Sequence, residues 1–302
     1  MKKKISIYSL YIVIAAILWG VDGILRRNLF VLPPIIIVFY EHLIGLLIIT
    51  PFIPSLLKKE RLTKNEWLSI VWVSLLSGLL GTLWFTTALV KTNFISFSVV
   101  FLLQKLQPIF AITTASIFLK EKINKKYISW ALLAFLSAYF VTFKNGIINF
   151  QTGEGTINAA LFALAAAFAW GSSTTFSRYT LVKHSNTLIT GLRFLFTTLF
   201  ALAAMFLLKL DSQIVTINMQ QLSQLTIIAL STGMVALWIY YKGLKHTQAK
   251  ISTIIELAFP LTAVFIDVVI YKNILAVSQY LAAIVLIFAI YKISELNKEI
   301  SK

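Results

Sequence analysis

Long apolar segments constrain the fold of this chain more than any other feature of its sequence. A helix needs about 20 mostly apolar residues to cross the hydrocarbon core of a bilayer. Ten such segments lie between charged breaks, near Ile5–Ile24, Pro33–Leu57, Trp67–Val90, Phe94–Leu119, Tyr127–Phe143, Ile157–Leu181, Thr187–Leu208, Leu222–Leu244, Ile251–Tyr271 and Val277–Ile293. These runs are continuous, whereas a barrel strand shows only about ten alternating residues. The sequence therefore predicts an all-α polytopic membrane protein with ten transmembrane helices.

The composition agrees with a membrane protein and excludes other classes. Of the 302 residues, 59 % are hydrophobic and 13 % are charged, whereas a soluble domain is about 45–50 % apolar and about a quarter charged. The chain has no Cys and three His, which excludes disulfides and argues against a metal site built from these residues. No phosphate-binding loop pattern is present, so the chain is not expected to hydrolyse ATP. No cofactor is expected.

The basic residues predict the orientation. With the amino terminus inside, 19 Lys and Arg residues lie near the cytoplasmic helix ends and six near the opposite ends. By the positive-inside rule, both termini are expected to be cytoplasmic. The composition, rich in Lys, Ile and Asn, favours a bacterial inner membrane. The net charge of +16 is then a topology signal with some attraction to anionic lipid, and no nucleic-acid partner is expected. The first apolar run is long and lacks a clear cleavage site, so we interpret it as a retained helix.

Residues of the first half recur in the second half at a nearly constant spacing. The spacing that aligns Pro108 with Pro260 also aligns Gln104 with Glu256. We therefore divide the chain into two five-helix repeats, residues 1–148 and 149–302. An odd number of helices in each repeat gives the repeats opposite orientations, and inverted repeats are typical of alternating-access transporters. The pairs, 151 or 152 positions apart, are Trp19 and Trp170, His42 and Arg193, and Pro108 and Pro260.

The same features are similar to a known superfamily. Ten helices in two inverted halves, with Trp-Gly in the first helix and Pro in the fourth helix of each half, resemble the EamA-like family of the drug/metabolite transporter superfamily. The stretches Leu106–Pro108 and Phe118–Ile123, with Glu121 at the helix end, add to the resemblance. The second half departs from it, because residues 270–273 include no acidic residue. The first half departs from it at His42, which stands where many members have Arg. The resemblance implies transport of amino acids, other metabolites, cations or drugs.

Ionisable side chains inside the predicted helices are candidate functional residues, because burying a charge in hydrocarbon is costly. Glu41 is suited to bind a substrate amine or a proton, and Lys105 a carboxylate or a phosphate. Alternatively, these two side chains form a structural ion pair. Asp22, near the outer end of the first helix, is expected to be a solvated helix end or a partner of Arg26.

Further candidates lie in the second half. Glu256 is expected to face the bundle interior in a substrate-binding or gating role. Arg193 is expected to form a gating or structural pair with Glu256, and His42 to make a hydrogen bond between helices. Pro108 and Pro260 each remove a backbone donor from the middle of a helix, so we expect hinges, or else fixed bends, at both positions.

The resemblance also places aromatic side chains along a central cavity. There they would hold cations or stack on flat organic groups, and the alternative is that they face lipid. The expected substrate site consists of Glu41, Lys105, Glu256, Trp19, Trp84, Trp170, Tyr40 and Gln104.

The sequence thus predicts a secondary transporter of a small organic metabolite, an amino acid or a related zwitterion or cation, that exports it by alternating access around a central cavity. Protons are expected to couple through Glu41, whose protonation would release Lys105. The alternatives are an efflux carrier for drugs or organic cations, a membrane enzyme or lipid-handling protein with Glu41 and His42 as acid and base, and a passive channel. The expected partners are the substrate, protons and the lipid bilayer, with the chain a monomer or a weak homodimer.

Overall fold

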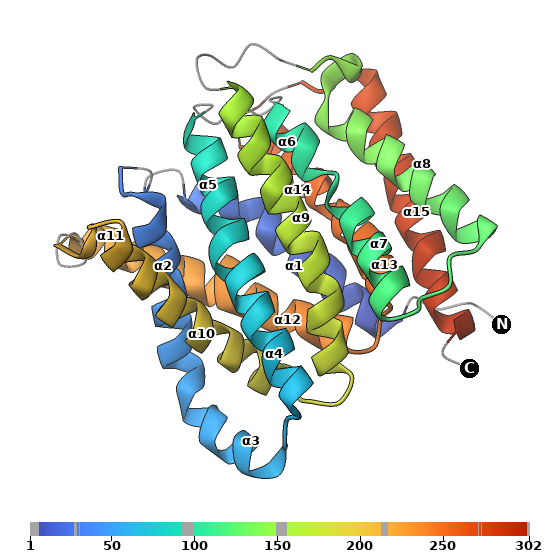
Figure 1. Cartoon of the computed structure of the whole chain (residues 1–302). Coiled ribbons are helices and arrows are strands. Elements are labelled where there is room, and N and C mark those ends of the chain that lie inside the picture. The colour runs from blue at the N-terminus through green and yellow to red at the C-terminus, as the bar shows by residue number, and fades with distance from the viewer. Residues whose placement is uncertain are drawn as a thin grey trace.

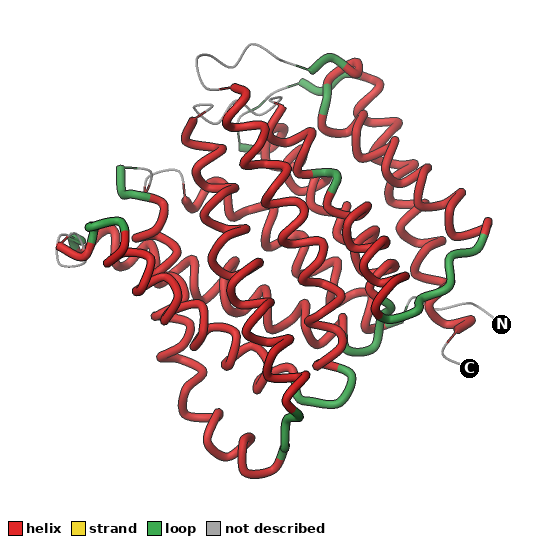
Figure 2. Tube along the Cα trace, viewed as in Figure 1, coloured by secondary structure: helices red, strands yellow, loops and turns green. Residues whose placement is uncertain are grey.

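The chain folds into a bundle of helices (Figure 1) in the computed structural model, which describes residues 6–26, 29, 31–91, 99–148, 156–212, 217–270, 272 and 274–300. The regular secondary structure of these residues is helical, and they contain no strand (Figure 2). Seven helices, some of them interrupted, are long and apolar enough to cross a membrane. These findings agree with the expected all-α polytopic protein.

The seven membrane-length helices account for most of the predicted spans. They are α1 (Ile7–Arg26), α2 with α3 (Pro34–Ile49 and Ile53–Lys59), α4 with α5 (Lys64–Val73 and Thr82–Lys91), α9 (Thr156–Leu181), α10 (Asn186–Leu207), α11 with α12 (Met219–Ile228 and Met234–Leu244) and α15 (Val277–Ile300). A shorter helix, α8 (Lys125–Thr142), packs along α15. Short 3₁₀ turns occupy Thr50–Phe52 and Lys144–Gly146. The count of ten membrane helices stays a prediction.

Two predicted spans are broken near their middle, each just before a proline. In the first, two residues separate the end of α6 (Val99–Gln104) from the start of α7 (Gln107–Phe118), which has Pro108 in its first turn. In the second, α13 (Ala249–Ile255) passes through the 3₁₀ turn η7 (Glu256–Ala258) into α14 (Phe259–Val269), with Pro260 in its first turn. Proline lacks a backbone N–H and its ring clashes with the preceding turn, but the first turn of a helix tolerates it. The prolines thus explain why both breaks fall where they do.

Two other spans contain π-helical segments, η3 (Ser74–Gly81) between α4 and α5 and η6 (Ala229–Gly233) between α11 and α12. Both end in glycine, at positions 152 residues apart. A Cβ added to Gly81 would lie 2.7 Å from Nε1 of Trp170, and one added to Gly233 would lie 2.8 Å from Oε1 of Glu41. Each glycine therefore permits a candidate side chain to approach the helix backbone closely.

The described connections between helices lie at two ends of the bundle (Figure 1). At one end, the ring of His246 stacks on Tyr8 near the start of α1, with 4.0 Å between ring centroids, and its carbonyl accepts a hydrogen bond from Asn297 near the end of α15. At the opposite end, Ser278 hydrogen-bonds Asn145 at 3.0 Å. The first and last helices thus reach the same end of the bundle. That this end faces the cytoplasm stays a prediction.

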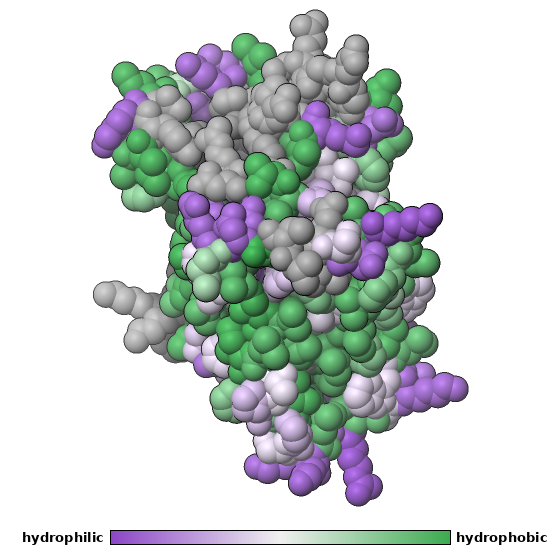
Figure 3. Space-filling view, turned by 90° about the vertical axis from the view of Figure 1, so that its left-hand side faces the viewer, coloured by the Kyte–Doolittle hydropathy of each residue, from purple (hydrophilic) through white to green (hydrophobic). Residues whose placement is uncertain are grey.

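The outside of the bundle is apolar in its middle. Hydrophobic residues cover the centre of the face shown in Figure 3, and hydrophilic residues gather toward its lower edge and its upper part. Large side chains on α8 and α15 stay more than half exposed, among them Leu132 (58 %), Leu136 (55 %) and Ile284 (66 %). In water such a surface would aggregate, whereas in a bilayer these side chains contact lipid tails. The surface agrees with a membrane-embedded protein.

Candidate functional site

The two helix breaks are joined by a row of polar side chains. Gln104 donates a hydrogen bond to Oε1 of Gln107 at 3.2 Å, and Gln107 donates to Oε2 of Glu256 at 3.0 Å. The hydroxyl of Tyr240, on α12, donates to Oε1 of Glu256 at 2.6 Å. Gln104, Gln107, Tyr240 and Glu256 are called the central cluster below. Trp19 of α1 packs on it, with its ring centroid 5.1 Å from that of Tyr240.

The central cluster explains how a break can exist in a membrane helix. Polar groups inside hydrocarbon need partners within the protein, and broken helices are tolerated where other elements supply these partners. Here α7 packs against both α9 and α13, which brings the first break beside the second. Gln104, Glu256 and Trp19 were expected at the substrate site, whereas Gln107 and Tyr240 were not. Tyr240 carries no charge and sits in a segment rich in aromatic residues, so the sequence held little signal for it.

Lys105 lies in the first break and is buried, with 5 % of its surface exposed. Its Nζ is 5.8 Å from the ring centroid of Phe259, which follows the second break. The alternative of an ion pair with Glu41 is not what the structure gives: Glu41 pairs with Arg26 instead, with 2.8 Å between Oε2 and Nη2. The helix packing explains this partner. Lys105 lies between α6 and α7, which pack against α9, whereas Arg26 is the last residue of α1 and its side chain reaches Glu41 on α2.

Asp22, Arg26 and Glu41 form a second group, called the charge cluster below. The Arg26 guanidinium bonds both carboxylates, Asp22 through Nε and Glu41 through Nη2. Its side chain is 10 % exposed, that of Glu41 is 7 % exposed and that of Asp22 is 21 % exposed. The Thr232 hydroxyl, in η6, donates to Asp22. The pair of Asp22 with Arg26 matches the sequence-based alternative for Asp22.

Arg193 of α10 meets the π segment η3 rather than Glu256. Its Nη2 donates to the Ser77 hydroxyl and its Nη1 to the Tyr241 hydroxyl, both at 2.8 Å. Trp170 also reaches η3, because its Nε1 donates to the Ser77 carbonyl at 3.2 Å. The structure does not form the expected pair of Arg193 with Glu256. Two hydroxyl groups accept from Nη1 and Nη2, and Nε stays buried without a hydrogen-bond partner among the described residues. Glu256 is held by Gln107 and Tyr240 instead.

His42 makes a different bond from the one expected. Its Nδ1 donates to the Val38 carbonyl one turn earlier in α2, at 2.8 Å, so this bond lies within a helix and not between helices. The ring itself reaches α10, with its centroid 4.8 Å from that of Phe194. His42 thus links α2 and α10 by ring packing.

Two of the expected site residues remain, Tyr40 and Trp84. Tyr40 packs with Phe39, with 5.2 Å between ring centroids, and against a small apolar cluster around Leu29 and Ile37. Trp84, on α5, is half-buried, and among the described residues it makes no hydrogen bond or ring contact with the central cluster. Whether either residue binds substrate stays a prediction.

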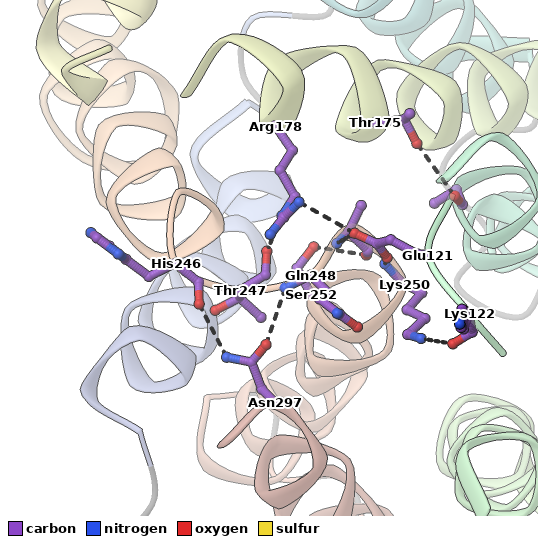
Figure 4. Close-up of polar contacts among 12 residues, drawn as sticks. Glu121, Lys122, Thr175, Arg178, His246, Thr247, Gln248, Lys250, Ser252 and Asn297 are labelled. Atoms are coloured by element: carbon purple, nitrogen blue, oxygen red, sulfur yellow. Dashed lines mark hydrogen bonds and ion pairs between the residues drawn. The ribbon is translucent and has the colours of Figure 1, made fainter. Parts of the chain in front are cut away.

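A further network closes the end of the bundle where α1 begins (Figure 4). The Glu121 carboxylate accepts from the backbone N–H groups of Ala249 at 2.8 Å and Lys250 at 3.0 Å, which caps α13. Arg178 places Nη1 3.5 Å from Glu121 and donates through Nε to the Thr247 carbonyl at 2.6 Å. A carboxylate at a helix N-terminus is favourable for the backbone dipoles. Glu121 thereby ties the end of α7 to the start of α13, and the sequence showed it only through the family resemblance.

Comparison with known proteins identifies the class of this chain. The sequence pattern of the EamA-like transporter family matches residues 6–143 and again residues 157–294. The chain belongs to the EamA-like transporter family. Each match of this EamA-like transporter falls within one of the two halves expected from the sequence, and the boundary between residues 148 and 149 stays a prediction. It is a multi-pass membrane transporter and not an enzyme.

Two individual proteins are similar to this EamA-like transporter. The riboflavin transporter ImpX of Fusobacterium nucleatum subsp. nucleatum is 37 % identical over 294 residues, which cover 96 % of this chain and 98 % of that protein. A crystal structure superposes with a TM-score of 0.75 over 99 % of this chain and all of that chain, at 15 % identity. The second comparison supports the fold alone.

Proposed function

We propose that this EamA-like transporter carries riboflavin, or a closely related flavin, across the membrane. The observation that carries the proposal is the 37 % identity to a riboflavin transporter over nearly the full length of both chains. The amino acid or zwitterion expected from the sequence becomes the second candidate. It is supported by Lys105, a buried cation in the first helix break that has no carboxylate partner among the described residues.

The central cluster suits the chemistry of a flavin ring. The ring is flat and aromatic, and its pyrimidine edge carries carbonyl acceptors beside an N–H donor. Trp19 and Tyr240 offer aromatic faces for stacking. The side-chain amides of Gln104 and Gln107 each hold donors and an acceptor, and the carboxylate of Glu256 accepts. Because these side chains come from both halves of the chain, opening and closing of the halves around them would give alternating access.

Uptake by proteoliposomes tests the riboflavin proposal. We expect saturable uptake of riboflavin, followed by its own fluorescence, and a loss of most of that uptake in Trp19→Leu. The matched control is Trp72→Leu, because Trp72 is 46 % exposed on the outside of the bundle. A panel of amino acids is offered as competitors and as labelled substrates. Movement of an amino acid without movement of riboflavin would instead favour the second candidate, and loading from either side shows whether export, as expected from the sequence, is the preferred direction.

Coupling to protons through Glu41 remains part of the proposal. The ion-pair partner that protonation would release is Arg26 and not Lys105. Two carboxylates, Asp22 and Glu41, share one guanidinium, so a proton on either acid leaves a neutral cluster. We expect an imposed pH gradient to increase riboflavin accumulation by the wild type and to have no effect on Glu41→Gln. Equal accumulation in all four combinations of protein and gradient would rule out coupling and leave the transporter assignment intact.

The acid–base alternative built on Glu41 and His42 is not retained. Glu41 is bound by Arg26, and Nδ1 of His42 bonds its own helix. Moreover, the family consists of transporters.

A further inference from the structure

The charge cluster contains a donor that the protein leaves unused. Arg26 is buried, with 8 % of its surface exposed. Its Nε and Nη2 bond Asp22 and Glu41, but its Nη1 is buried without a hydrogen-bond partner among the described residues. An unpaired guanidinium N–H inside a protein costs more than a lost surface bond. Its presence between two carboxylates points to an oxygen-bearing ligand that completes the bonding.

The charge cluster lies on the same face of α1 as the aromatic part of the central cluster. Trp19, Asp22 and Arg26 are spaced by three and four residues, so their side chains share one helix face. At 1.5 Å per residue, Asp22 lies about 4.5 Å and Arg26 about 10 Å along the axis from Trp19. A ligand with its ring at Trp19 and Tyr240 could therefore extend a tail along α1 to the charge cluster.

We propose that Asp22, Arg26 and Glu41 form the subsite for the polyol tail of the flavin. This proposal rests on the proposed riboflavin function and adds what recognises the non-aromatic part of the substrate. A hydroxyl both donates and accepts hydrogen bonds. The two carboxylates accept from hydroxyls, and Nη1 of Arg26 donates to one. Bonds to charged groups are about twice as strong as neutral ones, so a short polyol gains affinity here.

The charge of the subsite also selects among flavins. Two carboxylates and one guanidinium carry a formal charge of −1 when all are ionised. A phosphate at the end of the tail, as in flavin mononucleotide, adds a further charge of about −1.5 to −2. Like charges in a buried site repel each other strongly. The subsite therefore accepts the free polyol and rejects its phosphate ester.

The π segment η6 holds the subsite in place. Gly233 brings its backbone so close to Glu41 that an added Cβ would lie 2.8 Å from Oε1, and the neighbouring Thr232 donates to Asp22. The segment thereby contacts both carboxylates of the charge cluster. π segments occur frequently at functional sites.

Binding of three ligands to the full-length protein in detergent tests the proposal. The ligands are riboflavin, lumiflavin, which has the ring without the polyol, and flavin mononucleotide, and binding is measured by the change in flavin fluorescence. We expect the wild type to bind riboflavin at least about tenfold more tightly than either of the others. Glu41→Gln and Asp22→Asn are expected to lose the preference over lumiflavin while binding lumiflavin as the wild type does. Glu60→Gln, at the other end of the bundle, is the control and keeps the preference.

The outcomes separate this proposal from the function on which it rests. Equal affinity of the wild type for riboflavin and lumiflavin overturns the polyol subsite and leaves flavin transport standing. A similar loss of affinity for both ligands in Glu41→Gln and Asp22→Asn also overturns it, because it indicates a structural role. Failure of the wild type to bind any of the three contradicts the riboflavin proposal itself. The comparison of ligands on the wild type decides the matter even where a variant does not fold.

Discussion

Glu256 is the single acidic residue of the central cluster and is held from two sides, by Gln107 and by Tyr240. It lies in the 3₁₀ turn η7, where the helix is interrupted. A carboxylate in that position can exchange either partner for a substrate donor without leaving a buried charge alone. On the proposed function, we expect the charge of Glu256 to contribute to binding near the breaks.

We therefore expect Glu256→Gln to lower the rate of riboflavin uptake about tenfold, because a neutral amide forms weaker bonds than a carboxylate of the same shape. The variant keeps an acceptor for Tyr240, so its unfolding temperature should change little. Initial uptake rates and thermal unfolding in detergent measure the two quantities. An unchanged rate would show that the charge of Glu256 takes no part in transport.

A second prediction concerns His246, in the connection between α12 and α13. Partial burial against Tyr8 and the positive charge of Lys245 hold the pKa of His246 below its usual value of about 6.5. The unfolded chain then binds a proton more readily than the folded one, so stability is full above pH 6.5 and is lost as the pH falls below it. We expect the unfolding temperature of the wild type to drop more between pH 7.5 and 5.5 than that of His246→Phe. Equal drops would contradict the prediction.

At the scale of single residues, it is easier to identify the important side chains from the sequence than to identify their partners. Glu41, Lys105, Arg193 and Glu256 stand out because ionisable groups are rare in apolar segments. Their partners depend on helix crossings and on side-chain reach, which a one-dimensional pattern does not contain. The pairs expected for Glu41 and Arg193 were wrong for this reason.

Helix interruptions determine where the candidate sites lie. The central cluster lies at the breaks at Gln104 and Glu256. Arg193 contacts the π segment η3, and Glu41 contacts the π segment η6. Prolines made the two breaks predictable, although the hinge role of Pro108 and Pro260 stays a prediction. The π segments could not be predicted, because one extra residue in a helical turn leaves no distinct signature among Leu, Ser and Gly residues.

The close approach at η6 leads to a third prediction. Gly233→Ala places a Cβ 2.8 Å from Oε1 of Glu41, so the carboxylate or the helix must shift, at a cost of about 1–3 kcal/mol in unfolding free energy. We expect weaker binding of riboflavin with little change for lumiflavin. Ser231→Ala, in the same segment but bonded only to the Ile227 carbonyl, is the control. Wild-type stability and binding in Gly233→Ala would show that the contact carries no strain.

For the whole molecule, the polar contacts between the first and second halves include three groups: the charge cluster with η6, the central cluster, and the network around Glu121. The last of these joins the end of α7 to the start of α13. Alternating access requires that such contacts at one end break while those at the other end form.

We expect Glu121→Gln to open this end more often, because two bonds to a carboxylate become weaker bonds to an amide. The chain has no Cys, so Thr253→Cys, at a position 1 % exposed, provides a single reporter. Its reaction with a membrane-impermeant maleimide is expected to be about tenfold faster in the Glu121→Gln background. Asp211→Asn, an exposed position at the end of α10, is the control. An unchanged labelling rate would mean that Glu121 does not hold this end closed.

The cap that Glu121 places on α13 has no acidic equivalent in the second half, since position 273, 152 residues further on, is an asparagine. Two halves with identical ends would open to either side at the same free energy. On the proposed cycle, the Glu121 cap stabilises the closed form of one end, so we expect the empty carrier to rest open toward the other side of the membrane. Half-saturation for riboflavin should then occur at a lower concentration when the substrate is offered from that side, and the kinetics of the carrier should be asymmetric even in the absence of any driving gradient.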